Sequence, residues 1–227
     1  MRFMRGWLVA AAILFVTAAS QAQSPKLPRM VISPPGDGIR ELFLHPDDWR
    51  DARAMTGALL YADHNLSHFS DDELRVWFAT MRGWGIRLEL EVGAVKPWGH
   101  TAEATFKAEQ PLWDRVFRLG GDLGSVALDE PLDATRSALH QPDEYGVEQT
   151  ARFVELARQR YPGIRIGDIE PYPSIPLADQ VAWVRKLGQR LREHGGAPLD
   201  FYRLDVDWVA FTKSRRGAGP FSSACWA

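Results

Sequence analysis

Three stretches of this chain share one design, a short apolar run that ends in acidic residues. They lie at residues 125–130, 164–170 and 201–207. Segments with the periodicity of a helix, in which apolar residues recur every three or four positions, separate them. Strands that alternate with helices form a parallel sheet, and the strands of such a sheet end at the same edge. The repetition therefore predicts an α/β fold that gathers acidic side chains at one edge of a sheet.

Three more strands are predicted upstream, at residues 30–33, 58–62 and 86–92. The domain at 30–209 then holds about six strand–helix units, whereas a closed (β/α) barrel has eight. We therefore predict an incomplete barrel of the TIM type. After Trp208 neither periodicity continues, so residues 210–227 are expected to form an irregular tail, as a frameshift near Ala210 would leave. A short, open, doubly wound α/β sheet is the alternative.

The strand at 86–92 predicts a polar barrel interior. Its even-numbered residues are apolar and share one face, while Arg87, Glu89 and Glu91 share the other. The apolar face should meet the helices, which leaves the charged face to line the barrel. Charges in such a place are costly unless they are paired, so we expect polar partners for them inside the barrel.

Several residues indicate where helices begin and end. Ser70 and Glu73 have the spacing of a capping box, and Thr101 can cap the helix that follows it. That second helix is expected to break near Pro111, because proline has no N–H to donate within a helix. Residues 132–142 are expected to form a long loop, and long loops at the carboxyl ends of strands often carry function.

The amino terminus has the pattern of a secretory signal peptide. Two arginines precede an apolar run at 7–19, which is shorter than the roughly 20 residues that a membrane span needs. Small residues favour cleavage after Ala22, which predicts a signal peptide at 1–22 and a linker at 23–29. The mature protein is then expected to be secreted or periplasmic, with no stable membrane span. An uncleaved anchor is the alternative.

Charge and cysteine content exclude several classes of partner and site. The formal net charge is −2 and no basic stripe is present, so nucleic acid is not expected as a partner. The single cysteine, Cys225, can form neither an internal disulfide nor a cysteine metal site. The chain has no glycine-rich phosphate loop and no G-x-S-x-G nucleophile elbow. A carbohydrate is the expected ligand, for the reasons that follow.

Glu130 is the first catalytic candidate, because it follows the fourth predicted strand. Glycoside hydrolysis generally needs two carboxyl groups, about 5–5.5 Å apart for retention and roughly 6.5–9.5 Å apart for inversion. Acids at the ends of different barrel strands can meet these distances. We take Glu130 as the general acid/base and Glu170 or Asp207 as its partner. A purely structural role, in which Asp129 and Glu130 only cap the next segment, is the alternative.

With Glu130 at the end of its fourth predicted strand, the chain resembles in architecture, over about residues 30–207, the β-glycosidases that are built on (β/α)₈ barrels. In that clan a glutamate ending strand four is the general acid/base, and an asparagine usually precedes it where this chain has Asp129. The clan's nucleophile is a glutamate ending strand seven, beyond the six strands counted here. The resemblance implies a glycoside hydrolase that needs no cofactor or metal, or one that is inactive.

Other polar and aromatic residues near strand ends are expected to contact a sugar. Carboxylates and a lysine can hydrogen-bond hydroxyl groups, and flat aromatic faces suit the C–H groups of a sugar ring. Salt bridges to nearby arginines, and packing at the barrel rim, are the alternatives for these residues. The residues expected to bind substrate are Asp129, Asp168, Asp205, Lys96, Trp98, Tyr172 and Trp208.

Two other functions remain open at the level of sequence. A barrel that lacks its last strands can bind sugar without cleaving it, as a pseudoenzyme does. Asp63, His64 and His68 form the second alternative, since two histidines four residues apart beside an aspartate can ligate a metal. This arrangement is slightly similar to that of the metal-dependent polysaccharide deacetylases, but the spacing favours ordinary loop histidines.

Overall fold

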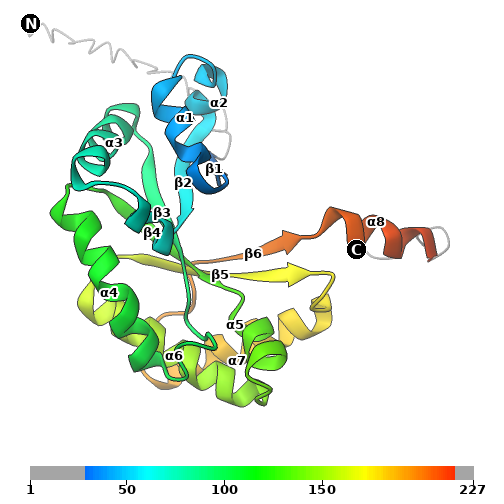
Figure 1. The fold of residues 1–227 in the computed structure, drawn as a ribbon. Coiled ribbons are helices and arrows are strands. Elements are labelled where there is room, and N and C mark those ends of the chain that lie inside the picture. Colours follow the sequence, from blue (N-terminus) through cyan, green and yellow to red (C-terminus); the bar gives the residue numbers. More distant parts are fainter. Residues whose placement is uncertain (1–28, 218–227) are drawn as a thin grey trace, which may run out of the picture.

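The computed structural model describes residues 29–217, which form one six-stranded parallel sheet (Figure 1). The strand order follows the chain, and every neighbouring pair is parallel. The strands are β1 (Met30–Ile32), β2 (Thr56–Ala62), β3 (Arg87–Val92), β4 (Leu123–Asp129), β5 (Arg165–Tyr172) and β6 (Phe201–Val206). A sequential order is that of a (β/α) barrel, whereas a doubly wound sheet reverses its order. The predicted fold class, an incomplete TIM-type barrel, is confirmed.

Helices connect the strands, and Figure 1 shows the main ones around the outer side of the curved sheet. Between β1 and β6 the sheet of the described residues stays open. The helices are α1 (Ile39–Leu44), α2 (Arg50–Met55), α3 (Asp71–Trp84), α4 (Ala102–Arg118), α5 (Pro131–Asp133), α6 (Asp143–Arg160), α7 (Leu177–Glu193) and α8 (Trp208–Gly217). Short 3₁₀ turns occupy Gly36–Gly38 and Asp63–His68, and a π-helical turn occupies Ala134–Ala138.

Parts of the predicted domain plan lie outside the described residues. These are the signal peptide at 1–22, nearly all of the linker at 23–29, and the part of the tail from 218 onward. Within 29–217, no helix combines the length and the apolar character that crossing a bilayer requires.

The two faces of the sheet differ in the way that the strand at 86–92 predicts. Outward-facing residues such as Leu88, Leu90 and Val126 are buried in the main apolar core, against the helices. On the inner face Glu89 is 2% exposed, and it is held by polar partners. Ser125 Oγ donates a hydrogen bond of 2.5 Å to its carboxylate, and Arg203 forms an ion pair with it. Polar partners thus hold Glu89 as predicted, but the inner face also carries a small apolar cluster of Leu60, Ala127 and Ile169.

The cap signals are confirmed as well. Ser70 Oγ accepts a hydrogen bond from the Glu73 N–H at 3.2 Å, and the Glu73 carboxylate accepts one from the Ser70 N–H at 3.0 Å. Thr101 Oγ1 accepts the N–H of Ala104 at 3.2 Å, which starts α4. These side chains satisfy N–H groups that a helix leaves unpaired in its first turn.

Three local predictions are wrong, and each segment is helical instead. Helix α4 runs through Pro111, which is exposed, so water can reach the carbonyl group that proline leaves unpaired. The predicted loop at 132–142 begins with α5 and the π-helical turn, because buried polar groups hold their backbone. The predicted irregular tail is helical over 210–217, because Asp207 Oδ1 accepts the N–H groups of Val209 and Ala210 at 2.9 Å each.

Candidate active site

A pocket of about 380 Å³ lies at the carboxyl ends of β2, β3 and β4. In (β/α) barrels this end of the strands is where active sites are built. Four of the residues that line the pocket are acidic, and one aromatic residue stands open to solvent at its wall. The polar and aromatic residues of the lining are Asp63, His64, Glu91, Lys96, Trp98, Glu109 and Asp129.

The inner face of the sheet supplies the two carboxylates at the centre of this site. Glu91 lies on β3 beside Ala127 of β4, and Asp129 follows two residues later on the same face. Lys96, just beyond β3, forms an ion pair with Asp129. The Lys96 carbonyl accepts the N–H of Gly99 at 3.0 Å, and this tight turn carries Trp98, which is 58% exposed.

Gly93 lets the chain turn closely around the pocket. A Cβ atom added there would lie 2.6 Å from Lys96 Cγ and 3.1 Å from Glu109 Oε1. Only glycine avoids these contacts without movement of its neighbours. The Gly93 N–H also donates a hydrogen bond of 2.6 Å to Glu109 Oε1, so this position joins β3 to α4 at the floor of the site.

Glu91 holds its proton more tightly than an ordinary glutamic acid. Burial raises its pKa to about 7; the charges of Asp129, Asp205 and Glu130 add to the rise, and Lys96 opposes it. Within residues 29–217 no hydrogen-bond donor reaches the Glu91 carboxylate. The pKa is raised because a charged carboxylate here has lost water without gaining a direct partner.

Glu130 lies next to this group, at the end of β4. Its backbone is left-handed, with φ of +50°, and its N–H donates to the Ile169 carbonyl at 2.9 Å. Burial raises the pKa of its carboxyl group, and Asp129 and Asp133 raise it further. A left-handed glutamate is uncommon, and such backbone strain tends to collect at functional sites. Glu130 is not among the residues that line the pocket, although its charge acts on Glu91.

Glu170 and Asp168 do not lie at the pocket, which corrects the roles predicted for them. Both are fully buried and lie on the face of β5 that packs against helices. Glu170 accepts the N–H groups of Leu132 and Asp133 at 2.6 and 3.2 Å, and Asp168 accepts the Trp183 indole N–H at 2.7 Å. Burial and mutual repulsion raise the pKa of Glu170. Glu170 thus holds the turn that follows Glu130, and Asp168 anchors Trp183 of α7.

Asp207, the other predicted partner, caps α8 with its carboxylate and is exposed. Asp205, two residues earlier, lies on the inner face and raises the pKa values of both Glu91 and Glu130. It is thus the residue of β6 that joins the site, whereas Asp207 acts as a helix cap.

Two of the three aromatic residues predicted to stack on sugar lie away from the pocket. Tyr172 packs against Phe211 with ring centroids 5.8 Å apart, and Trp208 packs against the same ring. Tyr172 is the last residue of β5 and Trp208 the first of α8, so both lie beside the end of β6. Trp98 lines the pocket and is the aromatic residue that fits the predicted role.

The histidine pair predicted as an alternative metal site is split. His64 lines the pocket and lies 3.9 Å from Asp63, while His68 is exposed and packs edge-on against Phe69. Within the described part of the chain no three His, Cys, Asp or Glu side chains are placed to hold a metal ion. The arrangement gives the deacetylase hypothesis no support.

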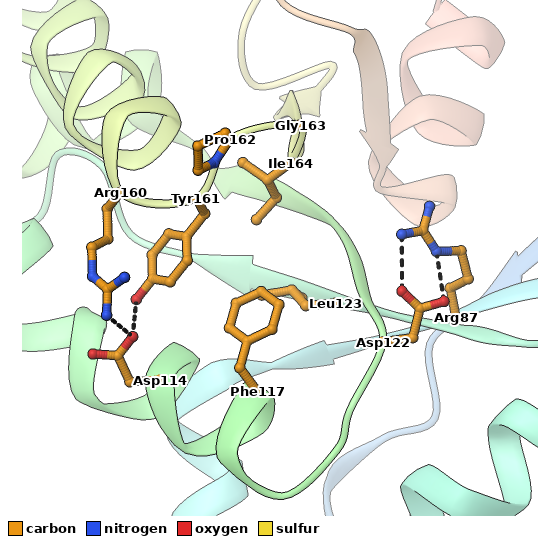
Figure 2. Close-up of a pocket in the computed structure, with 10 residues that line it drawn as sticks. All are labelled: Arg87, Asp114, Phe117, Asp122, Leu123, Arg160, Tyr161, Pro162, Gly163 and Ile164. Carbon is orange, nitrogen blue, oxygen red and sulfur yellow. Dashed lines mark hydrogen bonds and ion pairs between the residues drawn. The ribbon is translucent and has the colours of Figure 1, made fainter.

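A larger hollow of about 610 Å³ lies at the opposite edge, where β4 and β5 begin (Figure 2). Figure 2 shows that its charged residues already pair with each other: Arg87 with Asp122, and Arg160 with Asp114. Since barrel sites form at the carboxyl ends of strands, and the charges here are satisfied, this hollow is the weaker candidate.

Two residues of the site were not proposed from the sequence. The alternation at 86–92 predicts that Glu91 lies on the inner face, but it indicates no chemical role for it. Glu109 lies on α4 between the buried Phe106 and Trp113, where helical periodicity calls for an apolar residue. An acid inside an apolar stripe was the signal that could have found it.

No protein-family model matches the sequence, and no curated protein matches it either. Among solved structures, a D-psicose 3-epimerase crystallised in the presence of D-fructose has a TM-score of 0.48 and 17% identity, over 84% of this chain and 69% of that one. A mutant O-GlcNAc hydrolase from Thermobaculum terrenum has a TM-score of 0.47 and 13% identity, over 80% of this chain and 40% of that one. At this level of similarity they bear on neither family nor substrate.

Proposed function

We propose that this protein is a carbohydrate-active hydrolase that cleaves a glycosidic bond with Glu91 and Glu130. The observation that carries the proposal is the unpaired Glu91 carboxyl group, with its pKa raised to about 7, at the carboxyl end of a barrel strand. A general acid works best when its pKa lies near the working pH. Glycosidases pair such an acid with a second carboxylate, and Glu130 is the neighbour available for this.

The roles follow from the two environments. With its pKa raised to about 7, Glu91 stays partly protonated at neutral pH and donates that proton to the leaving oxygen. Glu130 is the less buried of the two and acts as base or nucleophile on the sugar. Lys96 neutralises Asp129 by its ion pair, and the open face of Trp98 suits stacking on a sugar ring.

Non-catalytic sugar binding is the second candidate. The observation in its favour is that the sheet formed by residues 29–217 is open between β1 and β6, where a closed barrel has further strands. Under this function Trp98 and the acids bind a sugar that is never cleaved.

Export is part of the same proposal. It rests on the arginines and the apolar run at 7–19, which together have the form of a signal peptide. Recovery of the mature chain from culture medium or periplasm, beginning after Ala22, is the expected result.

Hydrolysis of a panel of aryl α- and β-glycosides tests the function. Glu91→Gln should lower the rate roughly 10²–10⁴-fold, because it removes the proton donor and keeps the shape. Glu103→Gln, on the exposed side of α4, is the matched control and should hydrolyse normally. Unchanged hydrolysis in a folded Glu91→Gln variant would contradict the proposed mechanism, and binding without any hydrolysis in the wild type would favour the second candidate.

A further inference from the structure

The floor of the pocket holds a buried carboxylate with one oxygen to spare. Glu109 is 4% exposed, and its Oε1 accepts the Gly93 N–H at 2.6 Å. Its other oxygen, Oε2, is buried and has no hydrogen-bond partner within residues 29–217. Buried polar atoms are nearly always satisfied, so an oxygen left over beside a pocket indicates a missing donor.

Asp63 repeats this feature on the next element. It is 5% exposed, lines the same pocket, and its Oδ2 is also buried without a hydrogen bond. The indole N–H of Trp113 lies near enough to lower the pKa of Asp63 but outside hydrogen-bonding geometry. Burial raises the pKa values of both acids, and the charge of Asp63 adds to the rise at Glu109. The two acids therefore share one small region of low solvent access.

The charges of the pocket are unbalanced. Lys96 is the cation of its lining, and it is already paired with Asp129. Within residues 29–217 Glu109 forms no ion pair, and Asp63 has His64 at 3.9 Å, which carries charge only when protonated. A ligand that brings a positive charge and several N–H donors would supply what these acids lack.

We propose that this pocket is a subsite for a protonated primary amine carried by a sugar, such as the ammonium group of an amino sugar. The inference rests on the proposed function, since it names the substrate class of the same site. An ammonium group offers three donors and a charge, which match the free oxygens of Asp63 and Glu109, while Trp98 packs against the ring. The volume of about 380 Å³ is in the range of small-ligand pockets.

A divalent cation is the competing occupant of an acidic pocket. Such ions need several oxygen ligands converging on one point. No group of three potential ligands converges in this way within the described residues. An ammonium group makes no such demand, because each of its N–H bonds can meet a different acceptor.

Binding calorimetry at physiological salt tests the inference with three probes: a β-1,4-linked glucosamine trimer, its N-acetylated counterpart and cellotriose. The glucosamine trimer should bind about tenfold tighter than cellotriose, as expected for hydrogen bonds between charged groups. Glu109→Gln should remove most of this preference. The control is Glu103→Gln, the same substitution on the same helix at an exposed position, where the side chain pairs with Arg152 outside the pocket.

The readout is the ratio of the affinities, because a merely structural role of Glu109 would weaken all three probes together. Asp63→Asn provides a second variant if Glu109→Gln does not fold. Equal affinity for the glucosamine trimer and cellotriose overturns the inference, and so does a preference that survives in both variants. Binding of Mg²⁺, Ca²⁺ or Mn²⁺ with no preference among the sugars also overturns it.

The result is separable from that of the proposed function. Hydrolysis of neutral glycosides without preference for the amine would leave the hydrolase standing and remove the subsite. Tight binding of the glucosamine trimer without cleavage of any glycoside would leave the subsite standing and remove the hydrolase.

Discussion

Glu89 and Glu91 lie two residues apart on the same face of β3, yet their surroundings differ. Glu89 is held by Arg203 and by Ser125, so its charge is paired inside the half-barrel. Glu91, nearer the carboxyl end of the strand, faces other acids, and burial raises its pKa to about 7. On the inner face of β3, Glu89 therefore has a structural role, whereas Glu91 is a carboxyl group whose pKa suits proton transfer. What separates them is the set of partners that neighbouring strands supply.

Removing the partner of Glu89 should give the largest effect on stability. Arg203→Met leaves a buried carboxylate without its cation and should lower the free energy of unfolding by about 3 kcal/mol. Urea denaturation measures this. Arg165→Met is the matched control, since Arg165 is exposed, forms no ion pair within residues 29–217, and lies 5.7 Å from the centroid of the Phe201 ring. A loss no larger than that of the control would show that Glu89 is not held in the manner described.

The raised pKa of Glu91 should make the stability of the protein depend on pH. The folded protein keeps the Glu91 proton up to about pH 7, while the unfolded chain releases it near the usual value of 4.5. The folded state therefore binds more protons between these values, so stability falls as pH rises through this window. Glu91→Gln should remove part of that fall. Denaturation at pH 5 and pH 8 compares the variants, and identical pH dependence in the wild type and Glu91→Gln would contradict the raised pKa.

A smaller effect on stability is expected at Glu170. The sequence predicts this acid as a catalytic partner, but in the structure it accepts backbone N–H groups. Glu170→Gln weakens the cap on the N–H groups of Leu132 and Asp133, and should cost about 1 kcal/mol of stability. Its effect on glycoside hydrolysis should be far below that of Glu91→Gln, and parallel kinetics of the two variants measure this. A loss of activity as large as that of Glu91→Gln would restore Glu170 to the catalytic pair.

The sequence predicts the strands well because their apolar runs and terminal acids are local signals. The inner and outer faces are predictable where a strand alternates cleanly, as at 86–92. At β5 the same rule places Asp168 and Glu170 on one face, and Ile166 on that face is buried in the core with the helices. Because side chains two residues apart on a strand share a face, the buried Ile166 indicates that Asp168 and Glu170 also point away from the barrel interior.

Other parts of the site cannot be predicted from local sequence patterns. Glu109 reaches the pocket from α4, and its role depends on a contact with Gly93 sixteen residues away. The rise in the pKa of Glu91 requires Asp129 and Asp205, which come from two other strands. Such properties arise from the packing of distant segments, which periodicity along the chain does not encode.

The most direct test of the account is a titration of the Glu91 side chain by NMR, with ¹³C-labelled glutamate carboxyl groups. The Glu91 signal is assigned by its absence from Glu91→Gln. We predict that it titrates near pH 7, as its burial beside other acids requires. A midpoint near the usual value of 4.5 would contradict the account, because the site would then lack a proton donor at neutral pH.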